Sequence, residues 1–197
     1  MQRLHTLIAL LPELLQAGLL DPSGGSLAVR SSKGIHVSPF QSGELLRWKL
    51  SLDDFVLFPG AGDASMARAG RHPGREARLH RAILAARPDW NVIWHGHPWG
   101  LLGFSLAGCP LPVPLAHGRL LKPAKAVEVP VAGSAGQPLT PEMAVEAICS
   151  VFAGCENGAI LLHSHGPLVA GTNVESVLSL AQVLENLARA QQQLLRP

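Results

Sequence analysis

Two pairs of histidines are the residues of this chain best suited to chemistry. Each pair has the spacing His-x-His and directly follows a short apolar run: His95 and His97 follow residues 90–94, and His163 and His165 follow residues 159–162. Side chains alternate across a strand with a period of two, so a His-x-His pair on a strand places both imidazoles on one face, where they can share a metal ion. Two such pairs indicate a metalloenzyme.

A helix that carries a glutamate leads into the first histidine pair. Residues 75–86 have a strongly helical composition and end before Pro88. On a helix, Glu76 and His80 point the same way because they are four positions apart, about one turn along the axis. The Glu76 carboxylate can therefore fold back over a metal held by the histidines. Three nitrogen ligands with one carboxylate or water form a tetrahedral site that suits Zn²⁺.

Strand and helix patterns are interleaved along the chain. Helical periodicity or capping residues predict helices at residues 4–15, 75–86, from 140 onward, and 174–195. Short runs bounded by turn residues predict strands at 26–30, 34–37, 54–58, 90–94, 126–131, 159–162 and 167–170. We therefore expect an α/β fold of three layers, α/β/α, with a central sheet that is largely antiparallel or mixed. Residues 1–197 should form a single domain.

The composition excludes several classes of protein. With 47% apolar and only 15% charged residues, the chain is not disordered, and part of its surface should be covered by other subunits of a homo-oligomer. The formal charge of +2 provides no field to attract nucleic acid or an anionic membrane. Residues 1–20 contain Arg3, His5 and Glu13 and predict an amphipathic helix instead of a signal peptide, and no other stretch approaches the ~20 apolar residues of a membrane span.

The cysteines indicate the compartment. Cys109, Cys149 and Cys155 are odd in number and form no Cys-x-x-Cys motif, which argues against a disulfide framework and against a cysteine zinc site. We therefore expect a reducing compartment, the cytoplasm.

Four segments together carry a resemblance to a known family. They are residues 74–80 (GREARLH), 87–89 (RPD), 92–98 (VIWHGHP) and 161–166 (LLHSHG). Their order and spacing resemble the class II aldolase and adducin-head family, typified by L-fuculose-phosphate aldolase. A glycine-rich loop at 24–30 and a closing helix at 174–188 resemble that family more weakly. The resemblance covers nearly the whole chain and implies the class II aldolase fold.

The resemblance implies a role for each matching residue. It makes His95, His97 and His165 the metal ligands and Glu76 the catalytic residue. His163 has no metal role by this analogy, which leaves it as a hydrogen-bond partner behind the ligands, an acid near the substrate, or an alternative ligand. His80 matches a family histidine that supports the site without binding the metal. The backbone of Gly24, Gly25 and Ser26 would donate to the anionic end of the substrate.

The chain departs from the family where sugar-phosphate aldolases hold phosphate. Those positions read Ser26, Phe40-Gln41 and Gly74-Arg75, so most of the neutral donors of the family are missing. Arg75 could replace them with a charge-assisted contact to phosphate or carboxylate. Alternatively, Arg75 belongs to a solvated basic face with other arginines at positions 68, 71, 78 and 81. Phe40 should narrow or dry the pocket.

These residues lead to one expected function and its alternatives. The first expectation is a metal-dependent lyase that reversibly cleaves a carbon–carbon bond in a small anionic hydroxyketone, a sugar or sugar phosphate, through an enediolate stabilised by Zn²⁺ or another divalent transition metal. The chain contains no tyrosine, which the fuculose-phosphate type uses to protonate the aldehyde half, so another acid must serve. Alternatives are a ketose-phosphate dehydratase, a decarboxylase of a keto acid, and a non-catalytic scaffold like the adducin head. The family also implies a ring of subunits, usually a tetramer, with the site at the subunit interface.

Overall fold

A seven-stranded sheet forms the centre of the fold in the computed structural model, which describes residues 1–60, 65–67, 70–114, 128–137 and 139–194. The strand order is β3-β2-β1-β4-β9-β8-β7. The bounds are β1 Ser26–Ser31, β2 Gly34–Val37, β3 Val56–Phe58, β4 Val92–His95, β7 Val131–Ala132, β8 Asn157–Leu162 and β9 Gly166–Gly171. Neighbouring strands are antiparallel except β7 and β8, which are parallel, so the sheet is mixed. A second, two-stranded sheet pairs β5, Leu111–Pro112, with β6, Glu128–Val129.

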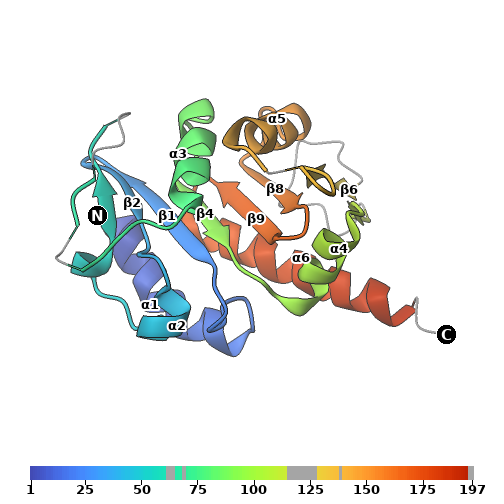
Figure 1. The fold of residues 1–197 in the computed structure, drawn as a ribbon, viewed down its shortest axis with the longest axis horizontal. Helices are drawn as coiled ribbons and strands as arrows, with labels where there is room; N and C mark the ends of the chain where they lie inside the picture. The colour runs from blue at the N-terminus through green and yellow to red at the C-terminus, as the bar shows by residue number, and fades with distance from the viewer. Residues whose placement is uncertain (61–64, 68–69, 115–127, 138, 195–197) are drawn as a thin grey trace.

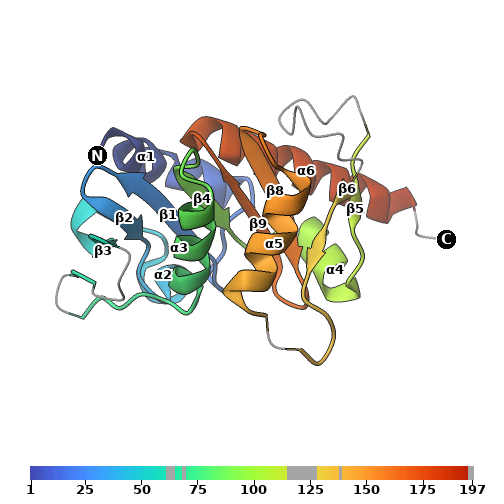
Figure 2. The same ribbon diagram turned by 90° about the horizontal axis from the view of Figure 1, so that it is seen from above.

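Helices cover both faces of the seven-stranded sheet (Figures 1 and 2). Helices α3, Glu76–Ala86, and α5, Pro141–Val151, pack together on one face. On the other face lie α1, Gln2–Gln16, and α6, Val174–Leu194, with α4, Trp99–Ala107, packed against α6. The short α2, Ser42–Leu46, and a 3₁₀-helix, Leu52–Asp54, lie between β2 and β3 in the chain. The expected α/β/α arrangement with a mixed sheet is confirmed.

The helices form where apolar side chains recur at helical spacing. In α1, Leu4, Leu7, Leu11 and Leu14 are all buried, so one stripe of the helix faces the core. Helix α5 begins at a Thr140 cap, whose Oγ1 accepts the backbone N–H of Met143 at 3.3 Å. No helix among the described residues is long and apolar enough to cross a membrane.

Some element boundaries differ from the sequence prediction for local reasons. The strand predicted at 54–58 begins only at Val56, because the Ser51 and Asp54 side chains cap the 3₁₀-helix that precedes it. The strand predicted at 126–131 is instead two short strands, β6 and β7, which belong to different sheets and are separated by Pro130; residues 126 and 127 lie outside the described residues. The closing helix extends to Leu194, and Leu195, where the prediction ended, lies outside the described residues.

The centre of the sheet brings the functional candidates together. Strand β4 lies between β1 and β9, and its last residue, His95, pairs with Ser26 on one side and Leu168 on the other. The two flanking strands therefore bring the glycine-rich loop before β1 and the hairpin before β9 to the carboxyl end of β4.

Candidate metal centre

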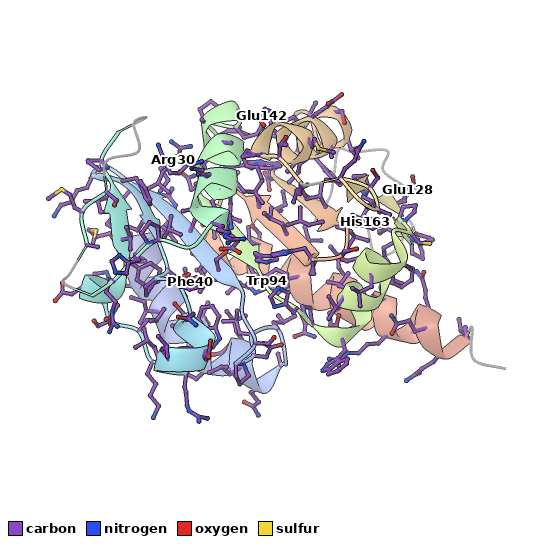
Figure 3. The ribbon with its side chains drawn as sticks, viewed as in Figure 1. Arg30, Phe40, Trp94, Glu128, Glu142 and His163 are labelled. Atoms are coloured by element: carbon purple, nitrogen blue, oxygen red, sulfur yellow. The ribbon has the colours of Figure 1, made fainter. Side chains whose placement is uncertain are left out.

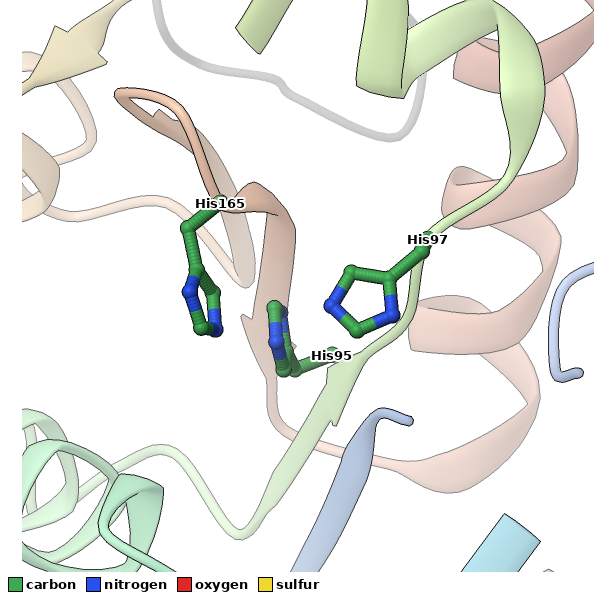
Figure 4. Close-up of side chains that lie close together, drawn as sticks. All are labelled: His95, His97 and His165. Atoms are coloured by element: carbon green, nitrogen blue, oxygen red, sulfur yellow. The ribbon is translucent and has the colours of Figure 1, made fainter. Parts of the chain in front are cut away.

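Three histidines from two segments converge at the carboxyl end of β4. His95 is the last residue of that strand, His97 follows two residues later, and His165 directly precedes β9. One ring nitrogen from each of the three lies within 4.8 Å of those of the other two (Figure 4). The ring centroids of His95 and His165 are 4.9 Å apart, and those of His95 and His97 are 5.0 Å apart. The cluster therefore offers three nitrogen donors to one point.

The protonation state of His95 suits a metal ligand. His95 Nδ1 lies 2.7 Å from the carbonyl oxygen of Pro167, which can only accept, so Nδ1 carries the proton and Nε2 presents a lone pair. Nε2 is buried and has no hydrogen-bond partner among the described residues. Burial holds the pKa of His95 well below its usual value, and the nearby His165 and His97 lower it further. A neutral imidazole with an unpaired, buried nitrogen fits a divalent ion.

Glycines make room for the His97 ring. A Cβ on Gly24 would lie 2.8 Å from His97 Cε1, and one on Gly166 would lie 3.0 Å from His97 Cδ2. The loop before β1 and the start of β9 can therefore both pack against this imidazole only where side chains are absent. Burial is the main cause of the lowered pKa of His97, and the neighbouring His165 adds to it, so His97 also favours the neutral form that binds metals.

The second histidine pair does not behave as the spacing predicted. His163, Ser164 and His165 form the turn between β8 and β9 and do not continue a strand, and Ser164 has a left-handed φ of 57°. The alternation of side chains along a strand therefore does not apply to this pair. His163 Nδ1 lies 2.9 Å from Ser164 Oγ, and its ring packs against Gly108 at the end of α4. Figure 3 shows His163 on the α4 side of the central strands, and only His165 of this pair joins the cluster.

The Glu76 carboxylate lies beside the cluster. Glu76 is the first residue of α3, and its Oε1 is 3.9 Å from His165 Nε2, which is too long for a hydrogen bond. A cavity of about 240 Å³ opens next to this pair. Its lining includes most of the residues that the sequence suggested for the site: Gly24, Gly25, Ser26, Glu76, His97 and His165. The candidate base, two of the ligands and the glycine-rich loop thus face one cavity.

Phe40 and Arg75 lie on different sides of Glu76. Phe40 lines the 240 Å³ cavity and is 57% exposed. Arg75 is exposed and lines a neighbouring cavity of about 370 Å³, together with Glu76, His163 and His165. The structure therefore does not bring Arg75 together with Gly24, Gly25 and Ser26. In the part of the chain that the structure describes, no lysine or arginine lines the smaller cavity.

The expected basic face is partly used inside the fold. Arg71 forms a salt bridge of 2.7 Å with Asp54, and the Arg81 guanidinium lies over the Phe58 ring at 4.6 Å. Arg68 lies outside the described residues. Of the four described positions in this set, Arg75 and Arg78 line the 370 Å³ cavity.

His80 lies behind the cavity and is fully buried. Its Nε2 is 3.1 Å from Ser26 Oγ, and its Nδ1 has no partner among the described residues. Burial lowers the pKa of His80 to about 3, so the ring is neutral at physiological pH. His80 is not part of the cluster of three histidines, and its supporting role remains a prediction.

One supporting residue escaped the sequence reasoning. Glu185 on α6 is fully buried and accepts the backbone N–H groups of Gly100 at 3.0 Å and Leu101 at 2.9 Å. Both residues lie in the first turn of α4, which begins at Trp99, two residues after His97. The carboxylate fixes the segment that carries this histidine, and because the contact spans 85 positions no local pattern reveals it.

Comparison with known proteins places this site in a family. The model of the class II aldolase and adducin N-terminal domain matches residues 5–192. The chain belongs to this family. Members of the class II aldolase family generally use a divalent metal, and the histidine cluster lies within the matched residues.

Several relatives of this chain are named as aldolases of sugar phosphates. The chain is 28% identical over 186 residues to the 5-methylthioribulose-1-phosphate/5-deoxyribulose-1-phosphate aldolase of Rhodospirillum rubrum. The alignment covers 93% of the chain and 77% of that protein. It is 27% identical over 180 residues to the L-fuculose phosphate aldolase of Haemophilus influenzae, covering 89% of the chain and 76% of that protein. A solved structure of L-fuculose 1-phosphate aldolase aligns with a TM-score of 0.76 at 22% identity, covering 100% of the chain and 89% of that structure. This structural likeness supports the fold.

Proposed function

We propose that this protein is a metal-dependent lyase that reversibly cleaves a carbon–carbon bond beside a carbonyl in a small hydroxyketone, a sugar or sugar phosphate. The observation that carries the proposal is the cluster of His95, His97 and His165 with a buried, unpaired nitrogen, next to the Glu76 carboxylate. Family membership and the named aldolase relatives support it. The retained donors argue against a non-catalytic scaffold.

The three histidines would hold one divalent ion, and zinc suits their donor set. When bound, such an ion supplies Lewis acidity that stabilises negative charge on the oxygens of a carbonyl and its neighbouring hydroxyl. The hydrogen bond from His95 to Pro167 fixes the ring so that Nε2 faces the cluster. Glu76 opens onto the cavity beside His165, where it can take a proton from a substrate atom and return it.

The smaller cavity would hold the anionic end of the substrate. Gly24 and Gly25 bring backbone close to the histidines, and Ser26 lines the same space. The relatives from Rhodospirillum rubrum and Haemophilus influenzae act on sugar phosphates, which favours a phosphate as the anion. Arg75 would meet a different part of the substrate, because it lines the neighbouring cavity on the other side of Glu76.

We further propose a homotetramer with the site near a subunit interface. Helix α4, which follows His97, exposes 80% of Trp99 and 58% of Leu106, and large apolar side chains of this kind are typical of covered surfaces. Analytical ultracentrifugation of the purified protein tests the tetramer, and Trp99→Arg should shift it toward smaller species. The free cysteines Cys109, Cys149 and Cys155 support a cytoplasmic location.

A metal analysis with two matched variants tests the site. His165→Ala should remove most bound metal, whereas His163→Ala, two positions away and outside the cluster, should retain it. Equal loss in both variants, or full retention in both, would contradict the ligand assignment. Proton-exchange NMR then tests the chemistry: deuterium uptake beside the carbonyl of dihydroxyacetone phosphate indicates enolate formation, and its absence across hydroxyketones and keto acids argues against a lyase of this type.

A further inference from the structure

A buried serine–histidine pair lies directly behind the proposed anion cavity. Ser26 Oγ and His80 Nε2 are 3.1 Å apart, and their side chains come from β1 and α3, 54 positions apart in the chain. The neighbours of His80 on the buried face of α3 are apolar, including Ile83 and Leu84. A buried nitrogen without a partner costs about 1–3 kcal/mol, and an apolar side chain at this position would avoid that cost. The histidine therefore calls for a role other than packing.

The neutral His80 ring has one N–H group and one nitrogen lone pair, so Ser26 and His80 can be hydrogen-bonded in two ways. In the first, Nε2–H donates to Ser26 Oγ, and the hydroxyl hydrogen of Ser26 is free. In the second, the Ser26 hydroxyl donates to Nε2, and the proton on Nδ1 is buried with no acceptor among the described residues. Orphaned buried N–H donors are rarer than orphaned acceptors, which favours the first arrangement.

A second serine–histidine pair in the same sheet has a competing acceptor beside it. Ser31 Oγ lies 2.9 Å from His36 Nε2 and 3.3 Å from the carbonyl oxygen of Gly34, to which it can donate its single hydrogen. Ser26 Oγ has no such second partner within the described chain, and Ser26 lines the 240 Å³ cavity. When Nε2–H of His80 donates to Ser26 Oγ, no protein acceptor in the described chain therefore competes with a cavity ligand for the hydroxyl hydrogen.

We propose that His80 is a positioning residue, whose Nε2–H donates to Ser26 Oγ and thereby turns the Ser26 hydroxyl into an obligatory donor toward the anionic end of the substrate. That the anion belongs to a substrate rests on the proposed function. The orientation matters because the described lining of this cavity contains the carboxylates Glu44 and Glu76 and no cationic side chain. Each neutral group must present hydrogen, not a lone pair, if an anion is to bind there.

Nitrogen-15 NMR of the histidine rings tests the connection directly. The unprotonated nitrogen of a neutral imidazole resonates far downfield of the protonated one, so the spectrum gives the tautomer of His80. We expect the proton on Nε2. A proton on Nδ1 would overturn the proposal, because the Ser26 hydroxyl would then donate its hydrogen to Nε2 of the ring. This measurement needs no turnover, so it stands even if no lyase activity is found.

Binding of 2-phosphoglycolate to the metal-loaded protein, measured by calorimetry, tests the consequence. Ser26→Ala should weaken binding about tenfold or more, since a hydrogen bond to a charged group is lost. His80→Phe should weaken it severalfold, whereas His80→Gln, whose amide nitrogen can replace Nε2–H, should bind nearly as well as the parent. The double variant Ser26→Ala/His80→Phe should bind no worse than Ser26→Ala alone, because His80 acts through Ser26.

The remote pair provides the matched control. His36→Phe removes the same kind of bond outside the cavity and should leave affinity unchanged. A folded His80→Phe protein that binds like the parent, or losses that add in the double variant, would refute the proposal. If His80→Phe does not fold, a strong loss of binding in the folded His80→Gln protein, or the wrong tautomer in the NMR spectrum, would refute it instead.

Discussion

Replacing the buried Glu185 with glutamine should destabilise the protein and loosen the proposed metal centre together. The two carboxylate oxygens accept Leu101 N–H at 2.9 Å and Gly100 N–H at 3.0 Å, and Arg189 pairs with the same group. Glutamine has one acceptor oxygen, so its amide NH₂ must face one of these N–H groups and leave that donor unpaired. An unsatisfied buried donor costs about 1–3 kcal/mol, and the charge-assisted bond to the other donor is also weakened. We expect a total loss of about 2–4 kcal/mol in the free energy of unfolding.

Urea denaturation followed by circular dichroism measures this loss, and titration with Zn²⁺ measures the effect on the site. Metal affinity should fall in Glu185→Gln, because the displaced start of α4 follows His97 by two residues. Arg189→Gln is the comparison: both backbone N–H groups keep their acceptors, and water can reach the half-exposed side chain at position 189, so this loss should be smaller than that of Glu185→Gln. A Glu185→Gln protein that unfolds at the same urea concentration as the parent would refute this account of α4.

Three further predictions concern single side chains. Glu76→Gln should retain the fold and most metal binding but lose about 100- to 10,000-fold in kcat, and near-normal turnover in a steady-state assay would show that another group moves the proton. Burial alone would raise the pKa of Asp54, but hydrogen bonds from Ser51 and Arg71 outweigh it and lower the pKa. Its contribution to stability is therefore present above the unfolded-state pKa and lost as the pH falls through the folded value. Asp54→Asn should cost about 1–3 kcal/mol at neutral pH, and urea denaturation across acidic pH should show the gap from the parent closing; a constant gap would contradict this. Arg75→Ala should raise KM by up to about fivefold with kcat nearly unchanged, because exposed ionic contacts are worth about 1 kcal/mol or less. An unchanged KM would indicate that Arg75 belongs to the solvated surface and does not contact the substrate.

The fold and the first histidine pair could be predicted because their signals are local. The stripe of α1 leucines depends on the geometry of one helix, and His95 and His97 lie at and just beyond the end of one strand, so both signals span only a few residues. The second pair was misjudged because the chain reverses at Ser164, and a period of two does not continue through a turn.

Contacts between distant segments could not be predicted in this way. The carbonyl of Pro167 orients His95 across 72 positions, and Glu185 reaches the start of α4 across 85. The sequence left Arg75 either as an anion contact or as part of a solvated basic face, and in the structure it precedes α3 and lines a different cavity from the glycine-rich loop. Such placements depend on how helices and strands pack against one another, and this packing cannot be deduced from the local pattern of a single sequence.

The β8–β9 hairpin has a thermodynamic consequence. It supplies His165 to the cluster and the Pro167 carbonyl that orients His95, so an ion held by both histidines would connect this hairpin to β4 noncovalently. Because an opened hairpin cannot offer that set of donors, ion binding and hairpin closure must reinforce each other by the same free energy. Amide hydrogen exchange at the turn around Ser164 should therefore slow as the site fills, and would report occupancy without any substrate.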